Sequence, residues 1–181
     1  MEKNRNQGFP VEASNQFVKV CGVEKDLSSL SSPKSPVRMT GKWNFKLFDG
    51  AMNLKQVNEG YNVITTAGTE FLSSFFNSAA TAASTFTMRY IALGTDATGE
   101  AASDTALGVE ISRHTAVVSN NSSSIFEIVA TFAPGSGTGA IAEYGLFSSN
   151  TAGTMLSRDT EPVINKQASD TLEVTAQITL S

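Results

Sequence analysis

The end of the chain limits the possible folds more than any other segment. Apolar and polar side chains alternate there without a break, and the apolar ones are Leu172, Val174, Ala176, Ile178 and Leu180. A period of two puts one set of side chains on one face of a strand, which predicts a half-buried β-strand over residues 171–180. A strand at a chain terminus frays unless other strands hold it. We therefore expect this segment to lie inside a sheet.

Shorter runs of the same kind recur through the chain. Strands are predicted at 43–47, 54–57, 89–93, 113–119, 126–132, 141–147 and 155–159. Turns and loops are predicted at 49–50, 95–108, 120–123, 134–139 and 148–153. Seven or eight short strands at this spacing favour an antiparallel β-sandwich or jelly-roll-like body over a βαβ fold. The predicted fold class is mainly β.

One segment has helical periodicity instead. Phe71, Leu72, Phe75, Phe76 and Ala79 fall on one face of a helix. Two threonines at 65 and 66 precede it and offer N-cap oxygens. We expect one short amphipathic helix over 66–78. Its aromatic face is predicted to pack on the sheet as core, rather than to form a ligand site.

The N-terminal residues 1–41 differ from the rest. Residues 26–36 read DLSSLSSPKSP, and serine and proline there disfavour regular structure. A short apolar alternation from Phe17 to Val23 predicts one strand, and Cys21 is the only cysteine in the chain, so no internal disulfide can form. We interpret 1–41 as an extended arm that becomes ordered against another surface, and 42–181 as the sandwich body. The alternative is a disordered tail.

Charge is divided unevenly along the chain. Residues 1–55 hold nine Lys/Arg and five Asp/Glu, whereas residues 56–181 hold four Lys/Arg and twelve Asp/Glu. A basic first part and an acidic remainder favour attraction between copies or docking on an acidic neighbour, with chance scatter as the alternative. The basic residues are spread singly, so nucleic acid is not an expected partner. No apolar run approaches the ~20 residues of a membrane span, and the N-terminus lacks a secretory apolar region.

The sequence contains few residue patterns of the kinds that catalysis or metal binding needs. His114 is the only histidine, and no GxSxG elbow accompanies it, so we expect a surface or interface residue. Asp96, Glu100 and Asp104 could ligate calcium but lack the EF-hand order, which leaves a solvated loop as the default. A carboxylate pair or a sugar-stacking role for Trp43 has no supporting motif. The predictions are therefore no enzyme, and no catalytic, cofactor-binding or metal-binding residues.

Three single residues within these segments allow local structural predictions. Gly145 inside a strand predicts a bulge or a close approach. Glu110 and Arg113, three residues apart, are expected to form an exposed ion pair that stabilises the fold little.

Seven blocks of sequence recur together in one type of protein. They are NVITTAG at 62–68, YIALGT at 90–95, AASDTALG at 101–108, EISR at 110–113, IAEYGLF at 141–147, MLSR at 155–158 and KQASDTL at 166–172. Their order and spacing over residues 60–181 resemble small virion structural proteins of tailed bacteriophages, of the tail, fibre, baseplate or head-decoration type. The resemblance carries no catalytic residues, and the N-terminal arm lies outside it.

The resemblance implies a non-enzymatic component of the virion, made in the host cytoplasm. Its expected partners are other virion proteins, in a homo-oligomer or around a symmetric partner, with the arm laid across a neighbour. A tail, neck, baseplate or fibre position is preferred, and capsid (head) decoration is the alternative. A host-surface carbohydrate-binding module, with a glycan as partner, and a hydrolase using His114 or a carboxylate pair are the other classes considered.

Overall fold

The computed structural model describes residues 17–20, 23–26, 38–77, 88–122 and 124–181. Contacts divide the chain into two units, Met1–Pro36 and Val37–Ser181. In the first unit, β1 (Phe17–Val20) and β2 (Val23–Asp26) form an antiparallel hairpin. The prediction of a single strand over this stretch was wrong, because the chain reverses between Val20 and Val23. Cys21 lies outside the described residues.

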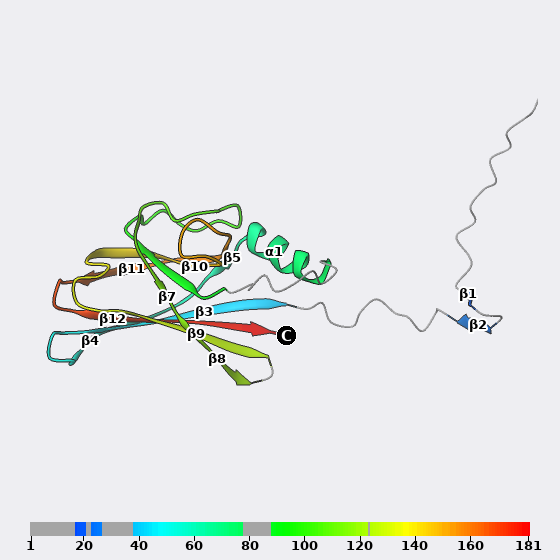
Figure 1. Cartoon of the computed structure of the whole chain (residues 1–181), viewed down its shortest axis with the longest axis horizontal. Helices are drawn as coiled ribbons and strands as arrows, with labels where there is room; N and C mark the ends of the chain where they lie inside the picture. Colours follow the sequence, from blue (N-terminus) through cyan, green and yellow to red (C-terminus); the bar gives the residue numbers. More distant parts are fainter. Residues whose placement is uncertain (1–16, 21–22, 27–37, 78–87, 123) are drawn as a thin grey trace, which may run out of the picture. The chain divides into compact units, whose positions relative to one another are not determined.

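The second unit is a sandwich of two five-stranded antiparallel sheets (Figure 1). One sheet has the order β4-β3-β12-β9-β8, and we call it the open sheet because one of its faces is exposed. Its strands are β3 (Met39–Phe48), β4 (Leu54–Tyr61), β8 (Val117–Ser122), β9 (Ile125–Phe132) and β12 (Thr171–Leu180). The mainly β, antiparallel sandwich class predicted from the sequence is confirmed.

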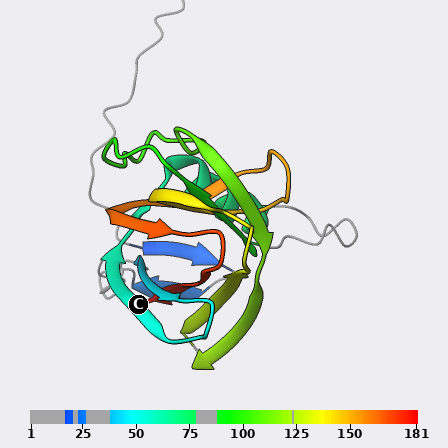
Figure 2. The same ribbon diagram turned by 90° about the vertical axis from the view of Figure 1, so that its left-hand side faces the viewer.

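The other sheet has the order β5-β11-β10-β6-β7, and we call it the covered sheet. Its strands are β5 (Val63–Ile64), β6 (Tyr90–Gly94), β7 (Glu110–Thr115), β10 (Gly139–Phe147) and β11 (Met155–Lys166). The two sheets face each other across the interior when the molecule is turned (Figure 2).

The C-terminal strand is the centre of the open sheet, as the alternation required. β12 pairs with β3 along Thr171–Leu180 and with β9 on its other side. Two backbone hydrogen bonds between Arg38 and Ser181, of 2.6 and 2.9 Å, continue the pairing to the last residue. The terminus is therefore held on both sides instead of fraying.

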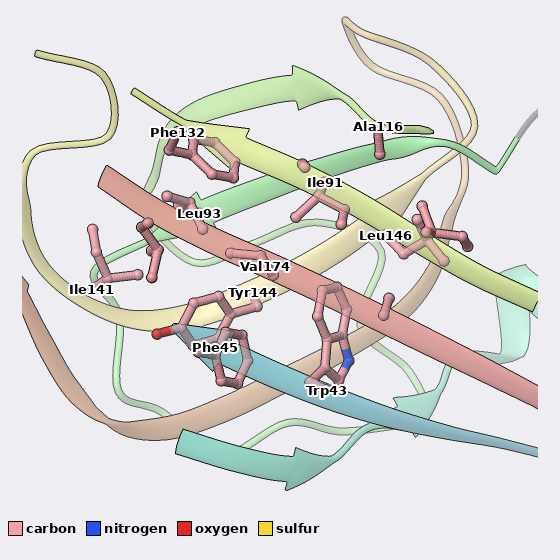
Figure 3. Packing of buried hydrophobic residues seen from close by; sticks show 14 of the residues in the cluster. Trp43, Phe45, Ile91, Leu93, Ala116, Phe132, Ile141, Tyr144, Leu146 and Val174 are labelled. Atoms are coloured by element: carbon pink, nitrogen blue, oxygen red, sulfur yellow. The ribbon is translucent and has the colours of Figure 1, made fainter. Parts of the chain in front are cut away.

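The core lies between the sheets and is built mainly by aromatic and branched side chains. Trp43 and Phe45 of β3 are fully buried and stack with a centroid distance of 6.0 Å. Tyr144 of β10 meets Phe45 from the opposite sheet at 4.0 Å (Figure 3). Rings of this kind bury the largest area per residue, so this trio anchors one sheet on the other.

The predicted helix forms as α1 (Thr66–Asn77). Thr65 caps it, since its Oγ1 accepts a 2.9 Å hydrogen bond from the Gly68 N–H. Leu72 packs on the core, as expected for this face, whereas the side chains of Phe75 and Phe76 lie outside the described part. Gly68 lets the helix approach β11 closely, because a Cβ there would lie 2.6 Å from the Leu156 carbonyl oxygen.

Three details of the strand prediction were wrong. The single strand expected at 113–119 is divided at buried Ala116 into β7 and β8, which belong to different sheets. The turn expected at 120–123 begins later, because β8 continues to Ser122. Strand β11 also extends beyond the predicted 155–159 to Lys166. The division at Ala116 and the unpredicted strand β5 give the described body ten strands where seven or eight were expected.

Candidate functional site

The blocks that the sequence resemblance rests on meet around one arginine. Arg158 of β11 is nearly buried, and its Nε and Nη2 donate to Glu143 of β10 at 3.1 and 2.9 Å. Its Nη1 donates to Asp104 of the 95–108 connection at 2.9 Å. Each of these three residues comes from a different block. We call Arg158, Glu143 and Asp104 the arginine clamp.

Glu143 is the fully buried member of the arginine clamp. Besides Arg158, its carboxylate accepts the backbone N–H groups of Gly108 at 2.8 Å and Val109 at 2.7 Å. A buried charge is tolerated when it is paired and hydrogen-bonded in this way. The carboxylate therefore holds the end of the 95–108 connection against the outer face of the covered sheet.

Asp104 holds the middle of the same connection. The backbone N–H of Ala101 donates to its Oδ2 at 2.8 Å. This hydrogen bond, and then Arg158, lower the pKa of Asp104 below its usual range, so the carboxylate is charged at neutral pH. The same connection also makes an apolar contact. Its Leu107 packs on Ala92, Phe147 and Met155 of the covered sheet.

The acidic side chains weighed as calcium ligands are therefore directed to other partners. Asp96 and Asp104 face Arg158, with Asp96 at 3.7 Å, and Glu100 accepts a hydrogen bond from Thr160. Within the described part of the chain, no three His, Cys, Asp or Glu side chains are placed to hold a metal ion.

A second polar cluster is formed by the block at 166–172. Lys166 is buried, and its ammonium donates to the carbonyls of Ala133 at 3.1 Å and Asp170 at 2.6 Å. The Asp170 carboxylate in turn accepts from Lys55 at 2.7 Å and from the Gln167 N–H at 3.0 Å. The hydrogen bond from Lys55 is the main cause that lowers the pKa of Asp170. We call Lys166, Asp170 and Lys55 the lysine clamp, and it fixes the turn between β11 and β12.

The pair predicted between Glu110 and Arg113 forms at 2.6 Å. It is not the exposed pair that the sequence suggested, because the Arg113 side chain is only 9% exposed. Its guanidinium lies 3.6 Å from the centroid of the Phe147 ring and donates to the carbonyls of Ser149 and Ala152. Arg113 thus joins the 148–153 loop to the outer face of the covered sheet.

Gly145 lies beneath this cover, as a close approach predicted. A Cβ there would lie 2.6 Å from Phe147 and 3.0 Å from Leu107, so the cover leaves no room for a larger residue.

His114 is half-buried and has a partner that the sequence did not reveal. Its ring stacks on Phe132 at 4.5 Å, and its Nε2 lies 2.8 Å from the Ser136 hydroxyl. Its Nδ1 lies 3.2 Å from the Thr131 carbonyl, which leaves Nε2 to accept from Ser136 when the imidazole is neutral. A backbone carbonyl thus stands where a catalytic triad has a carboxylate. Ser136 lies in the 134–139 loop, which carries no nucleophile motif.

A second arrangement missed from the sequence is a group of carboxylates on β11. Asp159 is 1% exposed, and its Oδ2 has no hydrogen-bond partner among the described residues. Burial, and then the charges of Glu161 and Glu100, raise the pKa of Asp159 to about 7. The hydroxyl of fully buried Tyr144 also lacks a partner within the described part, and burial raises its pKa.

The surface offers two concave regions. An apolar cavity of about 520 Å³ lies between α1 and the open sheet, and no charged side chain is among its described lining residues. A polar depression of about 450 Å³ lies on the exposed face of the open sheet, with Asn44, Lys46, Glu127 and Glu173 among its lining. Trp43 lines neither region and is fully buried in the core, so it is not a sugar-stacking platform, a role that no motif in the sequence supported.

The described residues contain no helix that is long and apolar enough to span a membrane. No protein family, curated protein or solved structure matches this chain. Function is therefore argued from the residues and their arrangement.

Proposed function

We propose that this protein is a non-enzymatic structural subunit of a tailed-bacteriophage virion. In this role it joins neighbouring virion subunits through its N-terminal arm, in the tail, neck, baseplate or fibre attachment. The observation that carries the proposal is the arginine clamp. Arg158, Glu143 and Asp104 come from three blocks of the phage-like pattern, and each uses its charge to hold a loop on a sheet. These residues therefore use their charges in contacts within the fold, which is what a scaffold requires.

The described part of the arm supports an assembly role because it is only a short hairpin. The hairpin β1–β2 has four residues in each strand. An isolated two-stranded hairpin is marginally stable in water, so it gains stability when it packs on another surface. The basic balance of residues 1–55, against the acidic balance of 56–181, favours docking on an acidic neighbour such as another copy.

Removing the arm tests the proposal. A truncation that starts at Val37 keeps the hydrogen bonds between Arg38 and Ser181, so the body should remain folded. We expect an unchanged thermal midpoint by circular dichroism and no incorporation into particles when the truncated chain replaces the full one. Normal incorporation would show that the arm does not mediate assembly. Locating the full chain in particles by electron microscopy distinguishes a tail position from head decoration.

Replacing His114 tests the non-enzymatic part. His114→Ala removes the contact with Ser136 but should leave particle incorporation unchanged. Any hydrolytic activity of the purified protein that disappears in His114→Ala, while the fold is retained, would contradict a purely structural role.

A glycan-binding role is the second candidate, and one observation favours it. Tyr61 is 78% exposed on β4, and it pairs with Lys42 beside the polar depression of the open sheet. An exposed aromatic ring next to amides and carboxylates suits a sugar. A screen against host-surface glycans would detect this role, and binding should then weaken in Tyr61→Ala and persist in the control Val117→Ala, which shortens another exposed side chain of the open sheet that does not line the depression.

A further inference from the structure

The edge strand β4 of the open sheet has a free outer side. β4 (Leu54–Tyr61) pairs with β3 on one side, and no described strand pairs with its other side. At eight residues it is longer than the other edge strands β5, β7 and β8, which have two, six and six. Figure 2 shows β4, in cyan, at the rim of its sheet. A long unpaired edge offers a row of backbone N–H and C=O groups to another strand.

Apolar side chains accompany this edge. Leu54 is 56% exposed, Val57 is 49% exposed and Tyr61 is 78% exposed. Soluble proteins often keep edge strands short, and β4 is not short; its charged residues are Lys55 and Glu59. β4 therefore has both the backbone and the side chains of a pairing surface.

The sequence of β4 is complementary to itself when reversed. The central residues read Lys55-Gln56-Val57-Asn58-Glu59. In an antiparallel pair of two such strands centred on Val57, Lys55 of each copy stands opposite Glu59 of the other. Gln56 stands opposite Asn58, and Val57 stands opposite its own copy. Moving the centre to Gln56 or Asn58 loses both Lys–Glu pairs, so the charges select one register.

We propose that β4 pairs antiparallel with β4 of a second copy, with Val57 on the two-fold axis. Each contact then occurs twice, as a two-fold interface requires. The open sheets of the two copies become one continuous sheet. The interface lies in the second unit of the chain and needs no residue of the N-terminal arm, so it does not depend on the proposed function.

The charged residues retain the capacity for these contacts. Lys55 already binds Asp170 at 2.7 Å, and Glu59 binds Lys42 at 2.9 Å and Asn44 at 3.0 Å. An ammonium has three donors and a carboxylate accepts several hydrogen bonds, so each can add one partner. Lys55 lies in the bulge opposite the step from Leu47 to Phe48, and in the proposed pair its ammonium turns from Asp170 toward Glu59 of the other copy.

The other long edge of the same sheet provides a control. β8 also exposes apolar residues, with Val117 at 74% and Val118 at 49%. Its six residues, VVSNNS, carry no charge, so nothing in them selects a register. Val117 therefore matches Val57 in type and is more exposed, at 74% against 49%, but it lies outside the proposed interface.

Sedimentation equilibrium of the full chain tests the proposal. We expect a concentration-dependent dimer for the wild type. Val57→Lys places two ammonium groups opposite each other on the axis, and it should raise the dimer Kd by about tenfold or more. Val117→Lys should leave the Kd unchanged, and thermal melts should show that both variants are folded. A monomeric wild type at all concentrations, or equal effects of the two variants, would overturn the proposal.

A charge exchange tests the register. Glu59→Lys alone puts like charges opposite each other and should weaken the dimer by about tenfold. Adding Lys55→Glu restores opposite charges across the axis and should return the Kd to near the wild-type value. Because Lys55→Glu also removes the ion pair with Asp170, the double variant carries Asp170→Asn as well, and the comparison is made with Glu59→Lys in the same Asp170→Asn background after thermal melts show that both are folded. A double variant as weak as the single one would refute the register. Truncation of residues 1–36 should leave the dimer intact, which separates this interface from the function proposed for the arm.

Discussion

The two sheets differ in how their outer faces meet water. In β12 of the open sheet, buried and partly exposed residues alternate along the strand. In β10 of the covered sheet, every residue from Ile141 to Phe147 is buried. The inner residues Tyr144 and Leu146 belong to the main core, whereas Glu143 and Phe147 lie under the 95–108 connection and its neighbours. Antiparallel sheets commonly leave one face solvated, and here one sheet does so and the other does not.

The difference shows that a sheet face can be closed by charge as well as by apolar contact. The main core needs no ion pairs because large side chains from both sheets fill it. The outer face of the covered sheet has a small apolar cluster of four buried residues, and the arginine clamp closes over it. We therefore expect the two regions to respond differently to substitution.

The largest effect is expected from opening the arginine clamp. Arg158→Ala leaves the buried Glu143 carboxylate without its cation, and it should lower the free energy of unfolding by about 3–5 kcal/mol. Urea titration measures the loss, and limited proteolysis should then cleave within 95–108. The control is Glu173→Ala, which removes an exposed pair with Lys46 and should cost at most about 1 kcal/mol. Equal losses would mean that the arginine clamp contributes no more than a surface pair.

A substitution on the inner face of the covered sheet should raise the free energy of unfolding instead of lowering it. Asp159 is a buried carboxylate of β11 opposite Tyr144, and its folded pKa of about 7 exceeds its unfolded value. The folded state therefore favours the protonated form, so the free energy of unfolding falls as pH rises from about 4 to about 7 and stays low above. Asp159→Asn removes this cost and should stabilise the protein by about 2–4 kcal/mol at pH 8.

Asp170 provides the contrast for that measurement. Its folded pKa is lowered by Lys55, so its contribution is present above its unfolded pKa and is lost as pH falls. Asp170→Asn should therefore destabilise the protein at pH 8, opposite in sign to Asp159→Asn. Thermal melts from pH 4 to pH 8 compare the two. A destabilising Asp159→Asn at pH 8 would show that the charged carboxylate has a stabilising partner.

The open sheet could be predicted from the sequence and the cover could not. Alternation marks β3, β9 and β12 because each has one face toward water and one toward the core. Residues 95–108 were correctly expected as a long loop, but nothing in them shows which face they cover. The partners of Arg158 lie 15 and 54 residues away along the chain, so only the fold brings them together. Ser136 was missed beside His114 for the same reason.

The smallest loss of stability is expected at Thr65, which links α1 to the covered sheet. The sequence offered Thr65 and Thr66 equally as helix caps, and the structure uses Thr65. This residue is fully buried, and its hydroxyl also donates to the Met155 carbonyl of the covered sheet at 2.5 Å.

Thr65→Val keeps the shape but removes both hydrogen bonds, so it should cost about 1–2 kcal/mol of unfolding free energy. Thr66→Ala, at the exposed first position of α1, should change stability by less than about 0.5 kcal/mol in urea titration. If the two variants lose the same amount, the buried Thr65 hydroxyl contributes no more to stability than an exposed one. A larger loss in Thr65→Val shows that this hydroxyl stabilises α1 through its two hydrogen bonds, the cap to Gly68 and the contact with Met155 of β11.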